Sequence, residues 1–136
     1  MRRTLRVLHI DDDPDTRFLM QELAAEAEQP GEDVRIEWLG AADVDEALAQ
    51  HAATDVHVVL LDNRLGGREG VDQIGRLRQT WQCPLWLVTG APDWNLVERA
   101  VSSGAAGLMG KDDLMADGAG LRKAILQAMG AGAGGG

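Results

Sequence analysis

The feature that most limits the possible fold is a regular alternation between short apolar runs and segments with helical periodicity. There are five apolar runs, namely LRVLHI (5–10), VRIEWL (34–39), VHVVLL (56–61), PLWLVT (84–89) and AAGLMG (105–110). Between them, apolar residues recur every three or four positions, as they do on one face of an amphipathic helix. Strands that alternate with helices in this way build a parallel sheet with helices on both faces. The pattern therefore predicts an α/β domain.

The polarity of the runs predicts their order in the sheet. The third and fourth runs are almost continuously apolar, which is typical of strands that are buried on both faces. The second run alternates apolar and charged residues, and the fifth contains two glycines, so both suit the edges of the sheet. We therefore expect a doubly wound, five-stranded parallel sheet with the order 2-1-3-4-5. The domain is predicted to cover residues 1–129, and GAGAGGG (130–136) is predicted to be a flexible tail or linker.

Composition narrows the classes of function. The net charge is −9 and the chain has no basic run, so direct binding to nucleic acid or to an anionic membrane is not expected. The apolar part of MRRTLRVLHI is too short for a signal peptide, and no apolar stretch is as long as a membrane span. The single cysteine, Cys83, cannot form an internal disulfide, which favours a reducing compartment. We expect a soluble, cytoplasmic protein.

Polar residues stand where four of the predicted strands end. Asp11 and Asp12 follow the first strand, Asp62 follows the third, Thr89 ends the fourth and Lys111 follows the fifth. In such a sheet, ligands bind at the carboxyl ends of the strands, beside the point where the strand order reverses. Carboxylates that converge there repel one another unless a cation or protons are present. Oxygen ligands next to a place for a phosphate predict Mg²⁺ rather than zinc.

The third aspartate of the DDD run has a different predicted role. Asp13 precedes Pro14, and proline is favoured at the first position of a helix, directly after a capping aspartate. Asp13 is therefore predicted to cap the first helix. His9, His51 and His57 do not have the pattern of metal ligands, and we interpret all three as structural or solvated.

Four segments together resemble a known family. They are IDDDPDTR (10–17), VVLLDNRLGGREG (58–70), LVTGA (87–91) and GAAGLMGKD (104–112). With these segments, residues 4–129 resemble the receiver domain of two-component response regulators, in the CheY-like superfamily. The resemblance implies a phospho-acceptor that takes a phosphoryl group from a histidine kinase or a histidine phosphotransfer protein in the presence of Mg²⁺. It implies a signalling protein rather than an enzyme that acts on a separate substrate.

The resemblance also implies a role for each polar position. Asp62 matches the aspartate that accepts the phosphoryl group. Asp12 is similar to the direct Mg²⁺ ligand, and Asp11 to the aspartate that acts through water. Asp62 and the backbone carbonyl of Arg64 complete the implied metal site.

Two further residues match positions that contact the phosphoryl group. Thr89 matches the hydroxyl that moves on activation, and Lys111 matches the lysine that pairs with the phosphoryl oxygens. In the family, a downstream protein usually binds the face made by the fourth helix, the fifth strand and the fifth helix. Residues 93–129 hold that place here. The resemblance implies a monomer or a weak dimer.

The sequence departs from the commonest family pattern at three positions. Asp112 follows Lys111, where most members have proline. Leu108 stands where an aromatic residue usually follows the motion of the threonine, so that part of the switch is absent or replaced. Gly66 replaces a common proline four residues after the acceptor, which predicts a more mobile loop.

Three alternatives share part of the pattern. A pseudo-receiver would have the same fold with an incomplete site, but all five polar positions are filled here. A Mg²⁺-dependent phosphohydrolase with an aspartate nucleophile would use a D-x-D pair such as Asp11 and Asp13, but it usually needs a longer chain. A flavodoxin-like FMN carrier needs a phosphate-binding loop after the first strand, and the DDDPD segment would repel a phosphate. The receiver interpretation explains the most residues.

Overall fold

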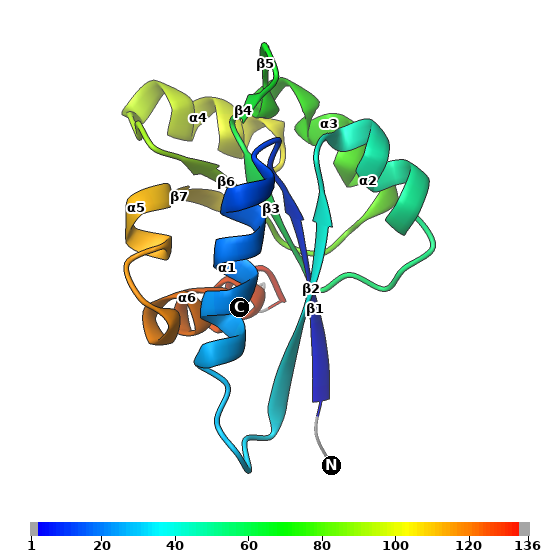
Figure 1. Ribbon diagram of the computed structural model, residues 1–136. Helices are drawn as coiled ribbons and strands as arrows, with labels where there is room; N and C mark the ends of the chain where they lie inside the picture. The colour runs from blue at the N-terminus through cyan, green and yellow to red at the C-terminus, as the bar shows by residue number, and fades with distance from the viewer. Residues whose placement is uncertain (1–2, 134–136) are drawn as a thin grey trace.

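A five-stranded parallel sheet runs through the middle of the molecule in the order β2-β1-β3-β6-β7 (Figure 1). The structure is a computed structural model that describes residues 3–133. Its strands are β1 (Arg3–Ile10), β2 (Val34–Ala41), β3 (Val58–Asp62), β6 (Leu85–Thr89) and β7 (Gly107–Gly110). Every neighbouring pair in this sheet is parallel. The predicted fold class and the predicted order 2-1-3-4-5 are both confirmed.

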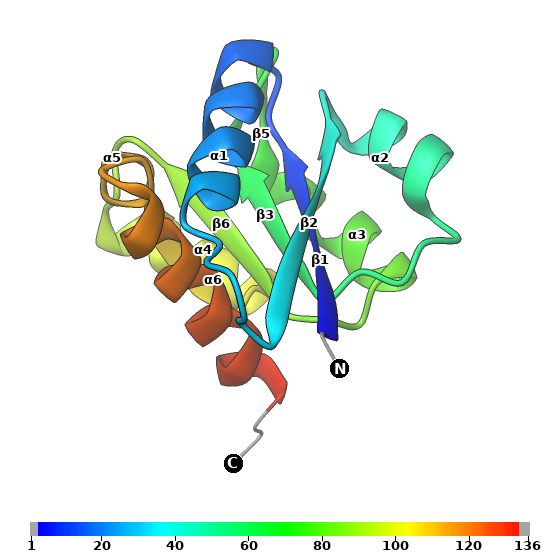
Figure 2. The same cartoon turned by 60° about the horizontal axis from the view of Figure 1, so that its bottom comes forward.

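Helices cover both faces of the sheet (Figure 2). One face packs against α2 (Val44–His51), α3 (Ile74–Thr80) and α4 (Trp94–Ser103). The other packs against α1 (Pro14–Glu26), the short α5 (Lys111–Leu114) and α6 (Gly118–Ala133). Because each face is covered, all five residues of β3 are buried.

Side chains of the central strands alternate between two hydrophobic cores. In β1, Leu8 and Ile10 belong to the core under α2, α3 and α4, whereas Val7 belongs to the core under α1 and α6. In β3, Leu61 belongs to the core under α2, α3 and α4, and Leu60 to the core under α1 and α6. Successive side chains of a strand point to opposite faces, so an apolar run without interruption supplies both cores.

Capping aspartates fix where α1, α2 and α4 begin, next to the carboxyl edge of the sheet. Asp13 accepts hydrogen bonds from the Asp15 backbone N–H at 3.0 Å and from the Thr16 hydroxyl at 2.9 Å, and Pro14 opens α1. The predicted capping role of Asp13 is therefore confirmed. Asp93 caps α4 by accepting the backbone N–H of Leu96 at 2.8 Å.

Three local features were not expected from the sequence. A small antiparallel hairpin, β4 (Arg64–Leu65) and β5 (Arg68–Glu69), follows the third sheet strand and leads into a 3₁₀ turn, η1 (Gly70–Gln73). The short helix α5 precedes the last long helix. That last helix, α6, continues to Ala133, so the first residues of the predicted tail are helical, while 134–136 lie outside the described residues.

No helix in the described part of the chain is long and apolar enough to cross a membrane.

Candidate functional site

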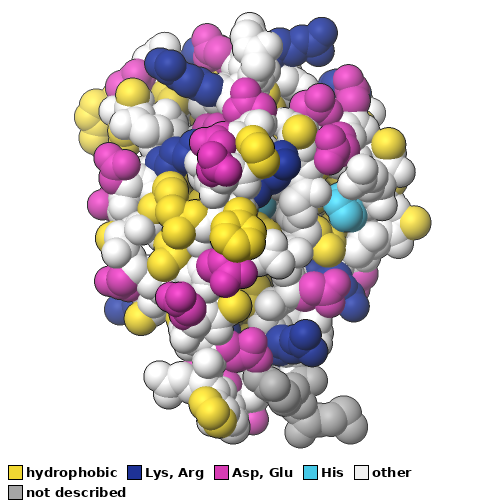
Figure 3. Space-filling model, in the orientation of Figure 1, with side chains coloured by type: hydrophobic (Ala, Val, Ile, Leu, Met, Phe, Trp, Pro, Cys, Tyr) yellow, Lys and Arg dark blue, Asp and Glu magenta, His cyan; other side chains and the backbone are white. Residues whose placement is uncertain are grey.

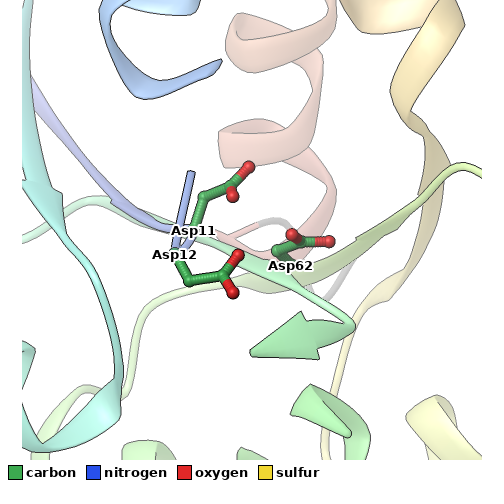
Figure 4. Close-up of side chains that lie close together, drawn as sticks. All are labelled: Asp11, Asp12 and Asp62. Atoms are coloured by element: carbon green, nitrogen blue, oxygen red, sulfur yellow. The ribbon is translucent and has the colours of Figure 1, made fainter. Parts of the chain in front are cut away.

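Strand register brings the three predicted site aspartates together at the carboxyl edge of the sheet. Ile10 pairs with Leu61, so the residues that follow them, Asp11 and Asp62, end neighbouring strands. Asp12 extends from the same loop as Asp11 (Figure 4). Each of the three aspartates offers one carboxylate oxygen, and these oxygens lie within 4.8 Å of one another.

Asp11 is almost completely buried and is held through both carboxylate oxygens. Its Oδ1 accepts the backbone N–H of Asp13 at 2.9 Å. Its Oδ2 lies 3.1 Å from Nζ of Lys111 and 3.6 Å from Nε2 of His9. Burial alone would raise the pKa of this carboxyl, but His9, the Asp13 N–H and Lys111 together outweigh burial and hold the pKa below its ordinary range. Asp11 is therefore ionised and fixed in place.

Asp12 has a more open environment than Asp11. It is exposed, and its Oδ2 accepts the backbone N–H of Gly66 at 3.0 Å. Its other oxygen accepts no hydrogen bond from the described residues. By their position after the first strand, Asp11 and Asp12 are similar carboxylates. The structure separates them, because only Asp12 keeps an uncommitted oxygen on the solvent side.

Asp62 ends β3 and is only 5% exposed. Its Oδ2 lies 3.5 Å from Nζ of Lys111, and its Oδ1 accepts the backbone N–H of Arg64 at 3.4 Å. Burial is the main reason that the pKa of this carboxyl rises to about 6, and the neighbouring charge of Asp11 adds to the effect. Lys111 partly offsets the rise. A further positive charge near Asp62 would favour its ionised form.

Thr89 ends β6, and Lys111 follows β7 as the first residue of α5. The Lys111 ammonium bridges Asp11 and Asp62; burial would lower its pKa, but the two carboxylates raise it. Thr89 is paired with Gly110 in the sheet register and is buried. Its hydroxyl accepts the backbone N–H of Ala91 at 3.1 Å, and no hydrogen bond joins it to Asp62 within the described residues.

The hairpin after Asp62 places the backbone of Arg64 beside the cluster. The Asn63 carbonyl accepts the Gly70 N–H at 2.7 Å. Opposite residues of an antiparallel pair alternate between hydrogen-bonded and non-hydrogen-bonded positions, so the next pair, Arg64 with Glu69, has no hydrogen bonds between its two residues. The Arg64 carbonyl therefore points away from its partner strand. Gly70 permits this close fold, because a Cβ there would overlap the backbone carbonyl of Asp62.

Two residues that support the site were missed by sequence reasoning. Arg17 of α1 donates from Nη1 to the backbone carbonyl of Asp11 at 2.8 Å. His9 is fully buried behind Asp11, although the sequence offered only a general structural interpretation for it. The missed signal is the spacing of His9 and Asp11, because positions i and i+2 of an extended strand lie on the same side.

The donor set fits a hard divalent cation. Three carboxylates converge, and Lys111 is the one ammonium or guanidinium group paired with them within residues 3–133. Their negative charge thus exceeds the local positive charge, and oxygen donors of this kind suit Mg²⁺ or Ca²⁺. The same cluster lacks the nitrogen and sulfur ligands that zinc prefers.

Comparisons with known proteins agree with this arrangement. Residues 7–118 match the family described as the response regulator receiver domain. No significant match was found among curated proteins.

Several solved structures have a similar fold. The signal receiver domain of the putative response regulator NarL from Mycobacterium tuberculosis is 24% identical, with 93% of this chain and 97% of that chain covered and a TM-score of 0.71. A CheY-like receiver domain protein from Methanospirillum hungatei is 19% identical, with 98% and 100% covered and a TM-score of 0.73. A response regulator protein from Burkholderia pseudomallei, with a phosphorylated aspartic acid, calcium ion and citrate, is 25% identical, with 93% and 68% covered and a TM-score of 0.68.

The family match covers well over half of the chain, and it includes the acidic cluster and the sheet that carries it. The chain therefore belongs to the response regulator receiver domain family, whose members are the phospho-accepting domains of two-component signal transduction.

Proposed function

We propose that Asp62 accepts a phosphoryl group from a histidine kinase or a histidine phosphotransfer protein. The observation that carries the proposal is the position of Asp62, which lies buried within the acidic cluster with the Lys111 ammonium 3.5 Å from its Oδ2. The phosphorylated aspartic acid in the relative from Burkholderia pseudomallei supports the same chemistry. The protein would promote only its own phosphorylation and dephosphorylation, so we do not class it as an enzyme with a separate substrate.

In the proposed step, a carboxylate oxygen of Asp62 attacks phosphorus. The bond between phosphorus and the histidine nitrogen of the donor breaks, and the imidazole leaves with the electron pair and takes up a proton. Transfer of this kind depends mainly on positioning and on neutralising charge at the phosphoryl oxygens. Lys111 supplies one positive charge beside Asp62, and the hydroxyl of Thr89, at the end of the neighbouring strand, would contact a phosphoryl oxygen after a loop movement.

We propose Mg²⁺ as the cofactor of this step. Asp12, Asp62 and the Arg64 carbonyl would hold the ion directly, and Asp11 would act through water. The uncommitted oxygen of Asp12 and the fixed carboxylate of Asp11 support this division. When bound, the ion supplies positive charge that offsets the carboxylates and the incoming phosphoryl oxygens.

The phosphodonor must approach the carboxyl edge of the sheet, where α1 begins. Figure 3 shows one face of the molecule, on which hydrophobic side chains gather over α1 among many acidic ones. Phe18 and Leu19 of α1 are exposed, at 65% and 45%. We propose that a kinase or phosphotransfer domain covers these apolar side chains during transfer. The single cysteine favours a reducing compartment, which supports the proposal that this exchange takes place in the cytoplasm.

Output would pass through the face formed by α4, β7 and α6. A groove of about 520 Å³ opens on this face, and Leu108 and Trp86 are among the residues that line it. Leu108 stands where many family members have an aromatic residue, so the proposed switch relies on Thr89 and its loop without that ring. A downstream protein that binds this face would sense the movement of the loop.

Acetyl phosphate provides a direct test of the phosphorylation proposal. Incubation with Mg²⁺ should add one phosphoryl group, seen by intact-protein mass spectrometry, and chelation of the metal should prevent it. Asp62→Asn should not be labelled, whereas Asp13→Asn, which alters only the helix cap, should be labelled like the unmodified protein. Labelling of Asp62→Asn at the normal level would overturn the assignment.

A further inference from the structure

His9 is a fully buried imidazole to which the proposed phosphorylation chemistry gives no role. It lies in β1, two residues before Asp11, and neither of its ring nitrogens has a hydrogen-bond partner within the described residues. Its ring meets the indole of Trp38 edge to face, with 5.4 Å between the centroids. Burial of two polar ring atoms without partners is costly, so an apolar residue would fill this place better if packing were the only requirement.

Within residues 3–133, the one carboxylate paired with this imidazole belongs to Asp11. His9 Nε2 lies 3.6 Å from Asp11 Oδ2, a buried oxygen that is ion-paired with Lys111 but accepts no hydrogen bond from the described residues. The unpartnered ring nitrogen and this carboxylate oxygen therefore face each other just beyond normal hydrogen-bond distance. A shift of a few tenths of an ångström would make each the partner of the other.

The same Asp11 oxygen also holds Lys111. Oδ2 of Asp11 lies 3.1 Å from Nζ of Lys111, and this ammonium is 3.5 Å from Oδ2 of Asp62. A continuous row of polar groups thus runs from the interior of the sheet to the acceptor aspartate. At its inner end, His9 is wedged against Trp38 and cannot turn freely.

We propose that His9 is a positioning residue, which donates from Nε2 to Asp11 and holds that carboxylate in the orientation needed to bind Mg²⁺ and to direct Lys111 at Asp62. The inference rests on the proposed function, because it concerns how the same site is held. Groups behind a metal ligand set its orientation, and their loss typically weakens metal binding about 10–100-fold. Asp11 is assigned a water-mediated contact, so we expect the lower end of that range.

Two substitutions separate positioning from packing. In His9→Gln, the side-chain amide nitrogen can occupy the place of Nε2 and keep a donor toward Asp11. In His9→Leu, the volume is largely kept and the donor is lost. His9→Met is a second apolar variant, useful because methionine adapts to irregular spaces and keeps the test open should the leucine variant fail to fold.

The measurement is the dissociation constant for Mg²⁺, followed by the backbone amide NMR signal of Gly66, whose N–H donates to Asp12. We expect binding about tenfold weaker in His9→Leu and His9→Met, and within twofold of the unmodified protein in His9→Gln. The rate of labelling by acetyl phosphate at low Mg²⁺ should fall in the same order. The free energy of unfolding, measured with a chelator, shows how much each change affects packing.

The outcomes distinguish this inference from the proposed function. Two results would show that His9 only fills space. One is normal Mg²⁺ affinity in the apolar variants. The other is an equal loss of Mg²⁺ affinity in His9→Gln and His9→Leu that parallels their loss of stability. If the unmodified protein binds no Mg²⁺ and is not labelled, the proposed function itself is wrong, and the positioning role is overturned with it.

Discussion

Nζ of Lys111 lies 3.5 Å from Oδ2 of Asp62, although the two residues are 49 positions apart in the chain. The ammonium also contacts Asp11, so it is the shared counter-ion of two buried carboxylates. Removing it would leave both charges without this partner in a place where water cannot replace it fully.

The first prediction concerns Lys111→Met, which removes the ammonium and keeps much of the side-chain length. Without Mg²⁺ at neutral pH, the free energy of unfolding should fall by about 1–3 kcal/mol, because charged hydrogen bonds to buried groups contribute that much. Urea denaturation in a chelator would measure it. Lys123→Met, at a solvent-exposed position of α6, is the matched control and should change stability little. Equal stability of both variants would show that Lys111 does not offset the carboxylates.

The second prediction concerns the pH dependence of stability in Asp62→Asn. The folded-state pKa of Asp62 is about 6, above the ordinary value of 3.8 for an aspartate. The carboxyl of Asp62 therefore holds its proton more tightly in the native state than in the unfolded chain. The stability that this difference contributes is fully present below about pH 4 and is lost as pH rises through about 6. Asparagine does not ionise, so Asp62→Asn should gain stability relative to the unmodified protein across that window.

The gain should reach at most about 3 kcal/mol above pH 6 without metal, because each pKa unit corresponds to about 1.4 kcal/mol. Denaturation curves between pH 4 and pH 8 in a chelator would measure the difference between the two proteins. A gain of the same size at pH 4 and at pH 8 would contradict the raised pKa of Asp62.

The third prediction concerns Arg64, whose exposed side chain forms no ion pair with the residues the structure describes. Its guanidinium is available to contact phosphoryl oxygens on Asp62 and to obstruct the hydrolytic water. Arg64→Asn should therefore speed the decay of the phosphorylated protein about tenfold, which is about 1.4 kcal/mol of barrier. Decay after removal of the phosphodonor would be followed by mass spectrometry. The control is Arg68→Asn, on the other strand of the same hairpin, whose phosphorylated form should decay at the normal rate. Unchanged or slower decay of phosphorylated Arg64→Asn would exclude the protective role of Arg64.

The fourth prediction concerns Trp94, which is 83% exposed at the start of α4, five residues after Thr89. If Thr89 and its loop move toward a phosphoryl group, the environment of this indole should change. Beryllofluoride with Mg²⁺ should therefore alter the fluorescence of the unmodified protein by more than that of Trp94→Phe. The subtraction removes the signals of Trp38, Trp81 and Trp86. Identical responses of the two proteins would argue against loop movement at this position.

Local patterns in the sequence were sufficient to predict much of the fold. The alternation of apolar runs with helical segments predicted the sheet, and the polarity of each run predicted its place in the order, because a central strand must be apolar on both faces. Asp13 before Pro14 predicted the start of α1, since capping depends on a few neighbouring residues. Gly66 and Gly67 both have positive φ in the turn of the hairpin, and a pair of glycines between two short strands is a local sequence signal for such a turn.

The sequence also named the polar residues at the strand ends, but the tertiary structure decided what each one contacts. It separated the buried, doubly held Asp11 from the exposed Asp12, and it placed Lys111 between Asp11 and Asp62. It also set His9 behind the cluster. Periodicity predicts which side of a strand a residue takes. The distances between the site residues, their burial and their pKa values depend on the register of strands that are far apart in sequence. They also depend on the helices that exclude water from the strand ends. Register and helix packing exist only once the chain has folded.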